Sequence, residues 1–323
     1  MKITLKCLSQ LLILSPMIPA ATLFEPLPIK AVGADLRAAR FPAAPDVPAR
    51  GVCLLLNGQT EFIEKYFEVI DELRERGFAV ATMDWRGQGG STRMTQDSRK
   101  SFVGDFGEYD DDLDTLINWI VTPMLAPGEK PVALAHSMGA HVLLRRLAAK
   151  PGSVRACVLS APMIAVSFRG QRELLVRAVT RYQMWRGKQT GWVWGMEARD
   201  PHKVTFAGQL VTSDPQRFER TQILLRENPD LRLAGATWGW LAAALRSMDW
   251  LKDKAPTITT DMLLVGAGKD RICVTPRTRE FAARLPHAEY TEIAESGHEI
   301  LMERNPIRAS FWTAFDAFML KHP

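Results

Sequence analysis

A serine lies in the pentapeptide Ala135-His136-Ser137-Met138-Gly139, between an apolar run and an amphipathic stretch. A serine in the turn from a strand to a helix is typical of a nucleophile elbow, in which the hydroxyl attacks a carbonyl carbon. Small residues are needed two positions before and after this serine because the backbone is crowded there. Ala135 and Gly139 are both small, although glycine is usual at the first position. The pattern predicts Ser137 as a nucleophile, with an ordinary serine at a helix N-cap as the alternative.

Two further residue types complete a catalytic triad in the chain order serine, acid, histidine. Asp270 follows a predicted strand, at the carboxyl end where the sites of parallel sheets lie. His298 follows the last predicted strand. We predict that His298 takes the proton of Ser137 and returns it to the leaving group, while Asp270 orients the imidazole. His136 is expected to point away from the serine and to have a structural role.

An oxyanion hole needs two backbone N–H groups that point at one oxygen. One is expected from Met138, directly after the nucleophile. The other is expected from the loop Asn57–Glu61, with Gln59 as the donor and Gly58 allowing a close approach of the backbone. A plain turn from strand to helix is the alternative. The glycine-rich loop 84–91 lacks the spacing of a nucleotide-binding motif and is expected to support the site, so we expect no cofactor and no metal.

These residues must be positioned by apolar β-rich runs that alternate with amphipathic helical patterns, as in a mostly parallel sheet flanked by helices. The expected strands are 51–56, 78–83, 132–136, 154–160, 261–265 and 288–293. The expected helices are 62–76, 109–125, 138–149, 276–285 and 306–320. The predicted α/β core has two parts, residues 24–161 and 248–323, separated by an inserted helical lid at 162–247.

The expected lid has an unusual composition. Residues 162–247 contain thirteen Lys or Arg, seven Asp or Glu, and five of the nine tryptophans. Tryptophan and arginine together favour a surface that contacts lipid headgroups and acyl chains, so peripheral membrane contact through the lid is one interpretation. The other is that the tryptophans pack the core of the lid and the arginines form a solvated face.

The remaining composition is that of an ordinary globular protein with a formal net charge of +5, and we expect no nucleic-acid partner. The four cysteines have no metal-site spacing and are expected to be reduced core thiols. Residues 1–23 resemble a signal peptide, but prolines interrupt the apolar stretch, the cleavage pattern is poor, and ~20 apolar residues are needed to cross a membrane. We expect a protein of the cytoplasm or the membrane periphery, while secretion and a true start at Met17 stay open.

The loop at Asn57, the loop 84–91, the elbow at Ser137, Asp270 and His298 together resemble the lysophospholipase and monoacylglycerol-lipase branch of the α/β-hydrolase superfamily. The resemblance extends from about Phe24 to the C-terminus, and it departs from the family where Asn57 replaces the usual histidine. It implies an α/β-hydrolase fold and hydrolysis of a carboxylic ester with an acyl chain, through an acyl-enzyme and without a cofactor.

The expected substrate is a small lipid-like ester, either a lysophospholipid or a monoacylglycerol. A short-chain carboxylesterase, a serine peptidase and a non-catalytic binding protein of the same fold stay open as alternatives. Epoxide hydrolases and dehalogenases are disfavoured because these relatives have an aspartate at the position of Ser137.

Overall fold

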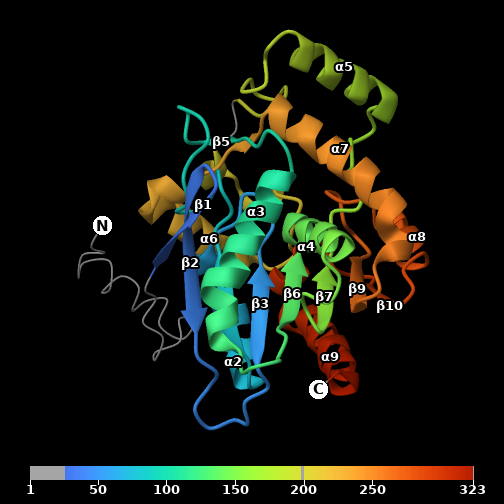
Figure 1. The fold of residues 1–323 in the computed structure, drawn as a ribbon. Helices are drawn as coiled ribbons and strands as arrows, with labels where there is room; N and C mark the ends of the chain where they lie inside the picture. Colours follow the sequence, from blue (N-terminus) through green and yellow to red (C-terminus); the bar gives the residue numbers. More distant parts are fainter. Residues whose placement is uncertain (1–25, 198–199, 323) are drawn as a thin grey trace.

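The computed structural model describes residues 26–197 and 200–322, so the expected N-terminal extension 1–23 lies outside the described residues. An eight-stranded sheet forms the centre of the molecule, in the order β1-β2-β4-β3-β6-β7-β9-β10 (Figure 1). Its strands are β1 (Leu27–Ala31), β2 (Ala34–Phe41), β3 (Val52–Leu56), β4 (Ala79–Met83), β6 (Val132–His136), β7 (Ala156–Ser160), β9 (Asp261–Ala267) and β10 (Ala288–Ile293). β2 is antiparallel to both of its neighbours, and every other neighbouring pair is parallel. The prediction of a mostly parallel α/β sheet is confirmed.

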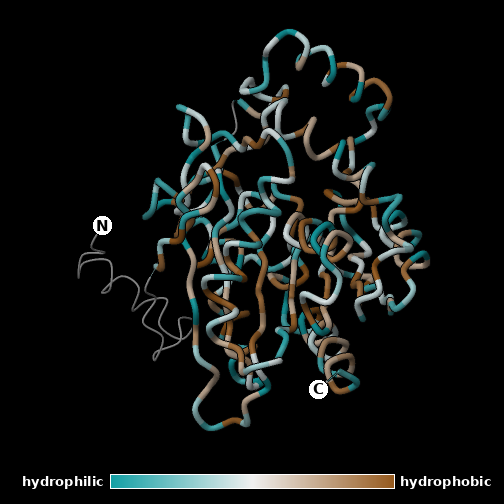
Figure 2. Tube along the Cα trace, in the orientation of Figure 1, coloured by the Kyte–Doolittle hydropathy of each residue, from teal (hydrophilic) through white to brown (hydrophobic). Residues whose placement is uncertain are grey.

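The central strands are apolar because helices cover them on both faces. Every residue of β3, β6 and β7 is buried, and Figure 2 shows these strands as hydrophobic stretches in the middle of the molecule. Such continuous apolar runs are typical of parallel strands without a solvent-facing side. They make the sheet a rigid support for the loops at its carboxyl edge.

Two layers of helices pack against this sheet. The helices of the core are α2 (Phe67–Glu75), α3 (Gly107–Leu116), α4 (Ser137–Ala149), α8 (Thr275–Ala282) and α9 (Asn305–Lys321). The apolar residues of α2 and α9 form one cluster with one face of the sheet. Those of α3, α4 and α8 form a second cluster with the other face. The expected helix 109–125 ends as an α-helix at Leu116 and continues as a π-turn and a 3-10 turn to Met124.

The chain between β7 and β9 is helical, as the sequence predicts. It contains α5 (Glu173–Trp185), α6 (Pro215–Glu227) and α7 (Trp238–Lys254). A two-residue strand, β8 (Gly235–Ala236), pairs with β5 (Lys100–Ser101) outside the main sheet. The expected end of the insertion, residue 247, lies inside α7. Both halves of this helix bury apolar residues against the core cluster. No helix among the described residues is long and apolar enough to cross a membrane.

Candidate active site

The loops after β6, β9 and β10 bring the three predicted triad residues together. Ser137 Oγ lies 2.9 Å from Nε2 of His298, and Nδ1 of His298 lies 2.7 Å from Oδ2 of Asp270. The other carboxylate oxygen of Asp270 accepts the backbone N–H groups of Ile272 and Cys273, both at 2.8 Å. The acid is therefore held by its own loop, and it faces the side of the imidazole opposite to the serine. All three side chains are largely buried.

The turn at Ser137 has the geometry of the predicted elbow. Ser137 has a φ of 50°, in the left-handed region that non-glycine residues rarely adopt. A Cβ at Gly139 would lie 2.5 Å from the carbonyl oxygen of Asn57 and 2.8 Å from that of Leu56. These are backbone atoms, which cannot easily give way, so the chain needs glycine at this position. The close packing also places the start of α4 against the loop that follows β3.

That loop lies beside the nucleophile. A Cβ on Gly58 would come within 3.1 Å of Ser137 Cβ. The Gln59 side chain donates a hydrogen bond to Ser101 Oγ at 3.2 Å, and the N–H of Thr60 donates to Gln88 Oε1 at 3.2 Å. Among the described residues, the backbone N–H of Gln59 has no acceptor. This N–H group is therefore free to donate to a ligand, as the predicted oxyanion hole requires.

The second expected donor is at the start of α4. The first N–H groups of a helix have no acceptor within the helix. Met138 is the second residue of α4, and the described part of the chain offers its N–H no other acceptor. The positive end of the helix dipole adds to the favourable potential for an anion here.

A buried cluster of charged side chains, centred on Glu61, holds the loop after β3 in place. Glu61 accepts the N–H of Gly58 at 2.5 Å, the hydroxyl of Tyr66 at 2.7 Å and the ammonium of Lys65 at 2.8 Å. Lys65 also donates to Glu299 at 2.6 Å. Burial opposes the charge of Glu61, but the Lys65 ammonium lowers the pKa of that carboxyl to about 2. Burial raises the pKa of Glu299, the residue directly after the triad histidine.

Sequence reasoning missed this cluster. Its members come from the segment between β3 and α2 and from the loop after β10, and no local motif connects these two segments. The position of Glu299 next to His298 was the one local signal that could have drawn attention to it.

His136 differs from the prediction. Its Nδ1 lies 3.1 Å from the carbonyl oxygen of Ser160, which is consistent with a structural role. Its ring does not turn away from the site, because its centroid lies 4.9 Å from that of the His298 ring. Burial lowers the pKa of His136 to about 4, so its ring is neutral near pH 7.

The loop 84–91, which the sequence predicts to support the site, contacts the loop after β3, because Gln88 Nε2 donates to the carbonyl oxygen of Gly58 at 2.8 Å. Asp84 accepts the N–H groups of Ile63 and Gly90 and pairs with the Arg37 guanidinium. These contacts join β2, the 3-10 turn Ile63–Tyr66 before α2, and this loop. Burial raises the pKa of Asp84 to about 6. The only potential metal ligands that cluster among the described residues are Asp270, Cys273 and His298, whose ligand atoms lie within 4.8 Å of one another. Two of these side chains are already joined by the triad hydrogen bond.

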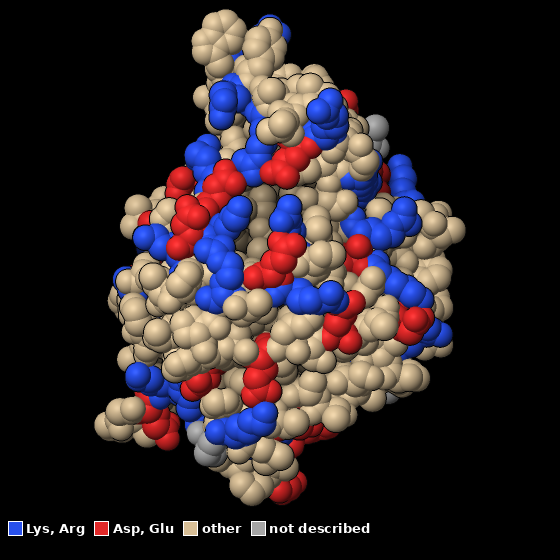
Figure 3. Space-filling model, turned by 90° about the vertical axis from the view of Figure 1, so that its right-hand side faces the viewer, with Lys and Arg blue, Asp and Glu red and all other residues tan. Residues whose placement is uncertain are grey.

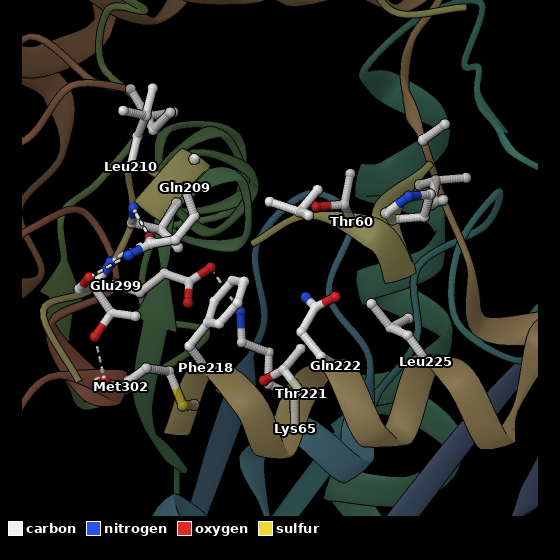
Figure 4. A pocket seen from close by; sticks show the side chains of 18 of the residues that line it. Thr60, Lys65, Gln209, Leu210, Phe218, Thr221, Gln222, Leu225, Glu299 and Met302 are labelled. Atoms are coloured by element: carbon white, nitrogen blue, oxygen red, sulfur yellow. Dashed lines mark hydrogen bonds and ion pairs between the residues drawn. The ribbon is translucent and has the colours of Figure 1, made fainter. Parts of the chain in front are cut away.

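A cavity of about 430 Å³ lies between the loop after β3 and α6 (Figure 4), and the side chains of Ser137, His298 and Asp270 are not among its lining residues. Its wall includes Thr60, Ile272 and Glu299, which are near neighbours in sequence of Gln59, Asp270 and His298. α6 and the loop before it form the opposite wall. The volume is in the range of about 300–1,000 Å³ that small-molecule sites occupy.

Comparison with known proteins agrees with this geometry. The family model described as serine aminopeptidase, S33, matches residues 47–305. The probable lysophospholipase L2 of Haemophilus influenzae is 26% identical over 277 residues, which cover 85% of each chain. Lysophospholipase L2 of Escherichia coli K12 is 27% identical over 302 residues, which cover 88% of this chain and 87% of the relative.

A solved structure shares the fold. The monoacylglycerol lipase of Paleococcus ferrophilus superposes with a TM-score of 0.69 at 22% identity, over 89% of this chain and 99% of the other. The expected resemblance to lysophospholipases and monoacylglycerol lipases is thus confirmed. The chain belongs to the family described as serine aminopeptidase, S33, and has the α/β-hydrolase fold.

Proposed function

We propose that this protein is a serine hydrolase that cleaves a carboxylic ester of a lipid-like substrate through an acyl-enzyme. The observation that carries the proposal is the continuous hydrogen-bonded chain from Ser137 through His298 to Asp270, at a strained elbow on the edge of the sheet. A serine hydroxyl is a weak nucleophile until a base accepts its proton. His298 is within reach of that proton, and Asp270 stabilises the imidazolium that results.

The reaction follows from these positions. Ser137 Oγ attacks the carbonyl carbon of the ester while its proton passes to Nε2 of His298. The oxyanion that forms is stabilised by the backbone N–H groups of Gln59 and Met138. The C–O bond to the alcohol breaks, and the alcohol leaves with the proton from His298. Water then attacks the acyl carbon and gives a proton to Nε2 of His298. The bond from that carbon to Ser137 Oγ breaks, Oγ takes the proton back from His298, and the fatty acid leaves.

The lipid character of the substrate is supported by the relatives, which are named lysophospholipases and cover most of this chain. The cavity between the loop after β3 and α6 supports it too, because α6 contributes apolar side chains such as Phe218 and Leu225 to its wall. A lysophospholipid and a monoacylglycerol share the features that this site would recognise, namely an acyl chain and a small polar alcohol.

We further propose that the insertion 162–247 is a lid that contacts the membrane surface through α5. Only Thr180 of this helix is buried. Four large apolar side chains of α5 are exposed: Leu174 76%, Leu175 60%, Tyr182 52% and Trp185 81%. Figure 3 shows tan and blue side chains gathered at the top of the molecule, the height at which Figure 1 places α5. Aromatic and basic side chains on one protruding helix match an anionic lipid surface.

The experiment that tests the catalytic proposal combines labelling and turnover. A fluorophosphonate probe should label the wild-type protein at one serine, and Ser137→Ala should abolish both the labelling and the hydrolysis of p-nitrophenyl esters. An Ser137→Ala protein that still labels or hydrolyses would contradict the assignment of the nucleophile.

The family description favours a second candidate, a serine peptidase, because the same triad cleaves amides. A substrate panel separates the two: p-nitrophenyl esters of increasing chain length, lysophosphatidylcholine, a monoacylglycerol and amino-acid p-nitroanilides. Turnover of the anilides alone would reject the ester proposal.

A further inference from the structure

The cavity between the loop after β3 and α6 contains a buried polar side chain without a partner. Gln222 lies on α6 and is only 5% exposed. Its Oε1 atom is buried, and no group of the described residues donates a hydrogen bond to it. A buried polar atom without a partner costs about 1–3 kcal/mol, so such atoms are uncommon in folded proteins. An unpaired carboxamide in a cavity wall therefore indicates a ligand that pairs with it.

The position of this side chain connects it with the reaction. In Figure 4 the Gln222 side chain projects from α6 toward the loop that carries Thr60. Thr60 is adjacent in sequence to Gln59, the proposed oxyanion donor, and Glu299 on the same cavity wall is adjacent to His298. A ligand group that contacts Gln222 thus lies near the two loops that carry Gln59 and His298.

Apart from the exposed Thr60, the other labelled polar side chains of the cavity already have partners. The Thr221 hydroxyl donates to the backbone of its own helix at Arg217. The carboxamide of Gln209 donates to the carbonyl of Thr212 at 2.6 Å and accepts the N–H of Val211 at 2.6 Å. Lys65 and Glu299 pair with each other. Among these side chains, Gln222 is therefore the buried one with an oxygen still available to accept a hydrogen bond from a ligand.

A carboxamide carries both an acceptor oxygen and donor N–H groups. A hydroxyl is complementary to both of these functions, since it can donate to Oε1 and accept from Nε2 at the same time. A quaternary ammonium has no N–H to donate, and an ionised phosphate oxygen could accept from Nε2 but would leave Oε1 without a donor. The chemistry of the site therefore favours an alcohol.

We propose that this cavity takes the alcohol part of the ester, and that Gln222 recognises a free hydroxyl of that alcohol. The inference rests on the proposed ester hydrolysis and adds to it a specificity-determining residue on α6. The hydroxyl has two sources, the glycerol of a monoacylglycerol and the glycerol of a lysophospholipid, and both carry the same group next to the acylated carbon.

The test uses pairs of esters that differ only in this hydroxyl. One pair is a 1-monoacylglycerol and the propyl ester of the same fatty acid. The other is 1-acyl-lysophosphatidylcholine and its analogue without the 2-hydroxyl. Gln222→Met keeps the length of the side chain and removes its hydrogen-bonding groups. Gln216→Met, on the exposed side of α6, is the matched control.

One net hydrogen bond is worth about 0.5–1.5 kcal/mol, which corresponds to a change of roughly two- to twelve-fold. We expect Gln222→Met to lower kcat/KM by roughly that factor for the hydroxyl-bearing member of a pair, and to leave the member without the hydroxyl unchanged. Gln222→Glu keeps an acceptor and should restore part of the loss. A response in one pair alone supports the proposal and identifies the source of the alcohol.

Two results would overturn the proposal. The first is a variant that affects both members of each pair equally, or neither. The second is a Gln222→Met protein with a clearly lower free energy of unfolding, because removal of an unpaired acceptor should leave stability unchanged or raise it. Failure of the ester chemistry is recognised separately, because the wild-type protein would then hydrolyse none of the four esters.

Discussion

The rings of His136 and His298 lie 4.9 Å apart, centroid to centroid, and are inclined by 54°. Two imidazoles in such contact cannot both be positively charged without repulsion in a buried setting. Burial keeps the His136 ring neutral, with its pKa at about 4. A positive charge on His298, which the proposed mechanism requires, therefore meets no charged imidazole at His136. His136, the residue before the proposed nucleophile, thus lies against the proposed base as a neutral ring.

The buried histidines predict a pH dependence of stability. Burial lowers the pKa of His136 to about 4 and that of His141 to about 3, below the value near 6.5 of an unfolded chain. Between these values the unfolded state binds more protons, so the free energy of unfolding should fall as the pH decreases from about 6.5 toward 4. The slope is at most about 1.4 kcal/mol per pH unit for each histidine.

Urea unfolding at pH 7, 6 and 5 measures this slope. Replacement His136→Asn removes one of the two titrating rings and should make the decrease shallower. A His136→Asn protein whose free energy of unfolding falls as steeply with decreasing pH as that of the wild type would contradict the assignment of a neutral buried His136.

Replacement Asp270→Asn should keep the fold and lower kcat by roughly 10⁴-fold. The amide has nearly the shape of the carboxylate, but it no longer stabilises the imidazolium or fixes its tautomer. The measurement is steady-state hydrolysis of a p-nitrophenyl ester. Asp253→Asn, on the exposed side of α7, is the control and should retain full activity. A similar loss in both variants would argue against a special role of Asp270.

Replacement Glu61→Gln should lower both stability and turnover. It removes the charged acceptor of the Gly58 N–H and of the Tyr66 hydroxyl, and it leaves Lys65 with Glu299 alone. We expect a loss of about 1–3 kcal/mol in the free energy of unfolding and a decrease in kcat larger than any change in KM.

The Glu61 experiment has a matched control in Glu75→Gln, an exposed position at the end of α2 that should change neither quantity. A Glu61→Gln protein with normal kcat would show that the loop after β3 holds its shape without this carboxylate.

Replacement Trp185→Ala should weaken binding to anionic vesicles. The side chain is 81% exposed on α5, and burial of a large apolar side chain in the lipid interface is worth about 1.5–3 kcal/mol. A loss of roughly 12- to 160-fold in affinity for phosphatidylglycerol vesicles is therefore expected, with unchanged hydrolysis of a short p-nitrophenyl ester. Trp119→Ala is the control, because Trp119 is 70% exposed outside the insertion. Equal effects of both variants would exclude α5 as the membrane contact.

The sequence predicted the parts of this fold that leave a local pattern. The apolar runs at β3, β6 and β7 identified strands covered on both faces, and the order of Ser137, Asp270 and His298 identified side chains that the structure joins by hydrogen bonds. The hairpin of β1 and β2 was not predicted, because β2 (ADLRAARF) alternates apolar and charged residues over only a short length.

What the sequence could not provide are relationships between distant segments. Glu299 meets Lys65 across 234 positions, and the cavity exists only because α6 lies opposite the loop after β3. The expected end of the insertion, residue 247, falls within α7, which is one continuous helix from Trp238 to Lys254.

Four non-glycine residues among those described have a positive φ: Thr60, Ser137, Ala161 and Arg169. Thr60 and Arg169 line the cavity, and Ser137 is the proposed nucleophile. Each such conformation costs of order 1–3 kcal/mol and persists only where its surroundings enforce it. The molecule is thus least relaxed where it would react, and Ser137→Gly should give an inactive protein that resists unfolding better than the wild type. Selection for turnover, rather than for durability, would then be what retains a serine at the elbow.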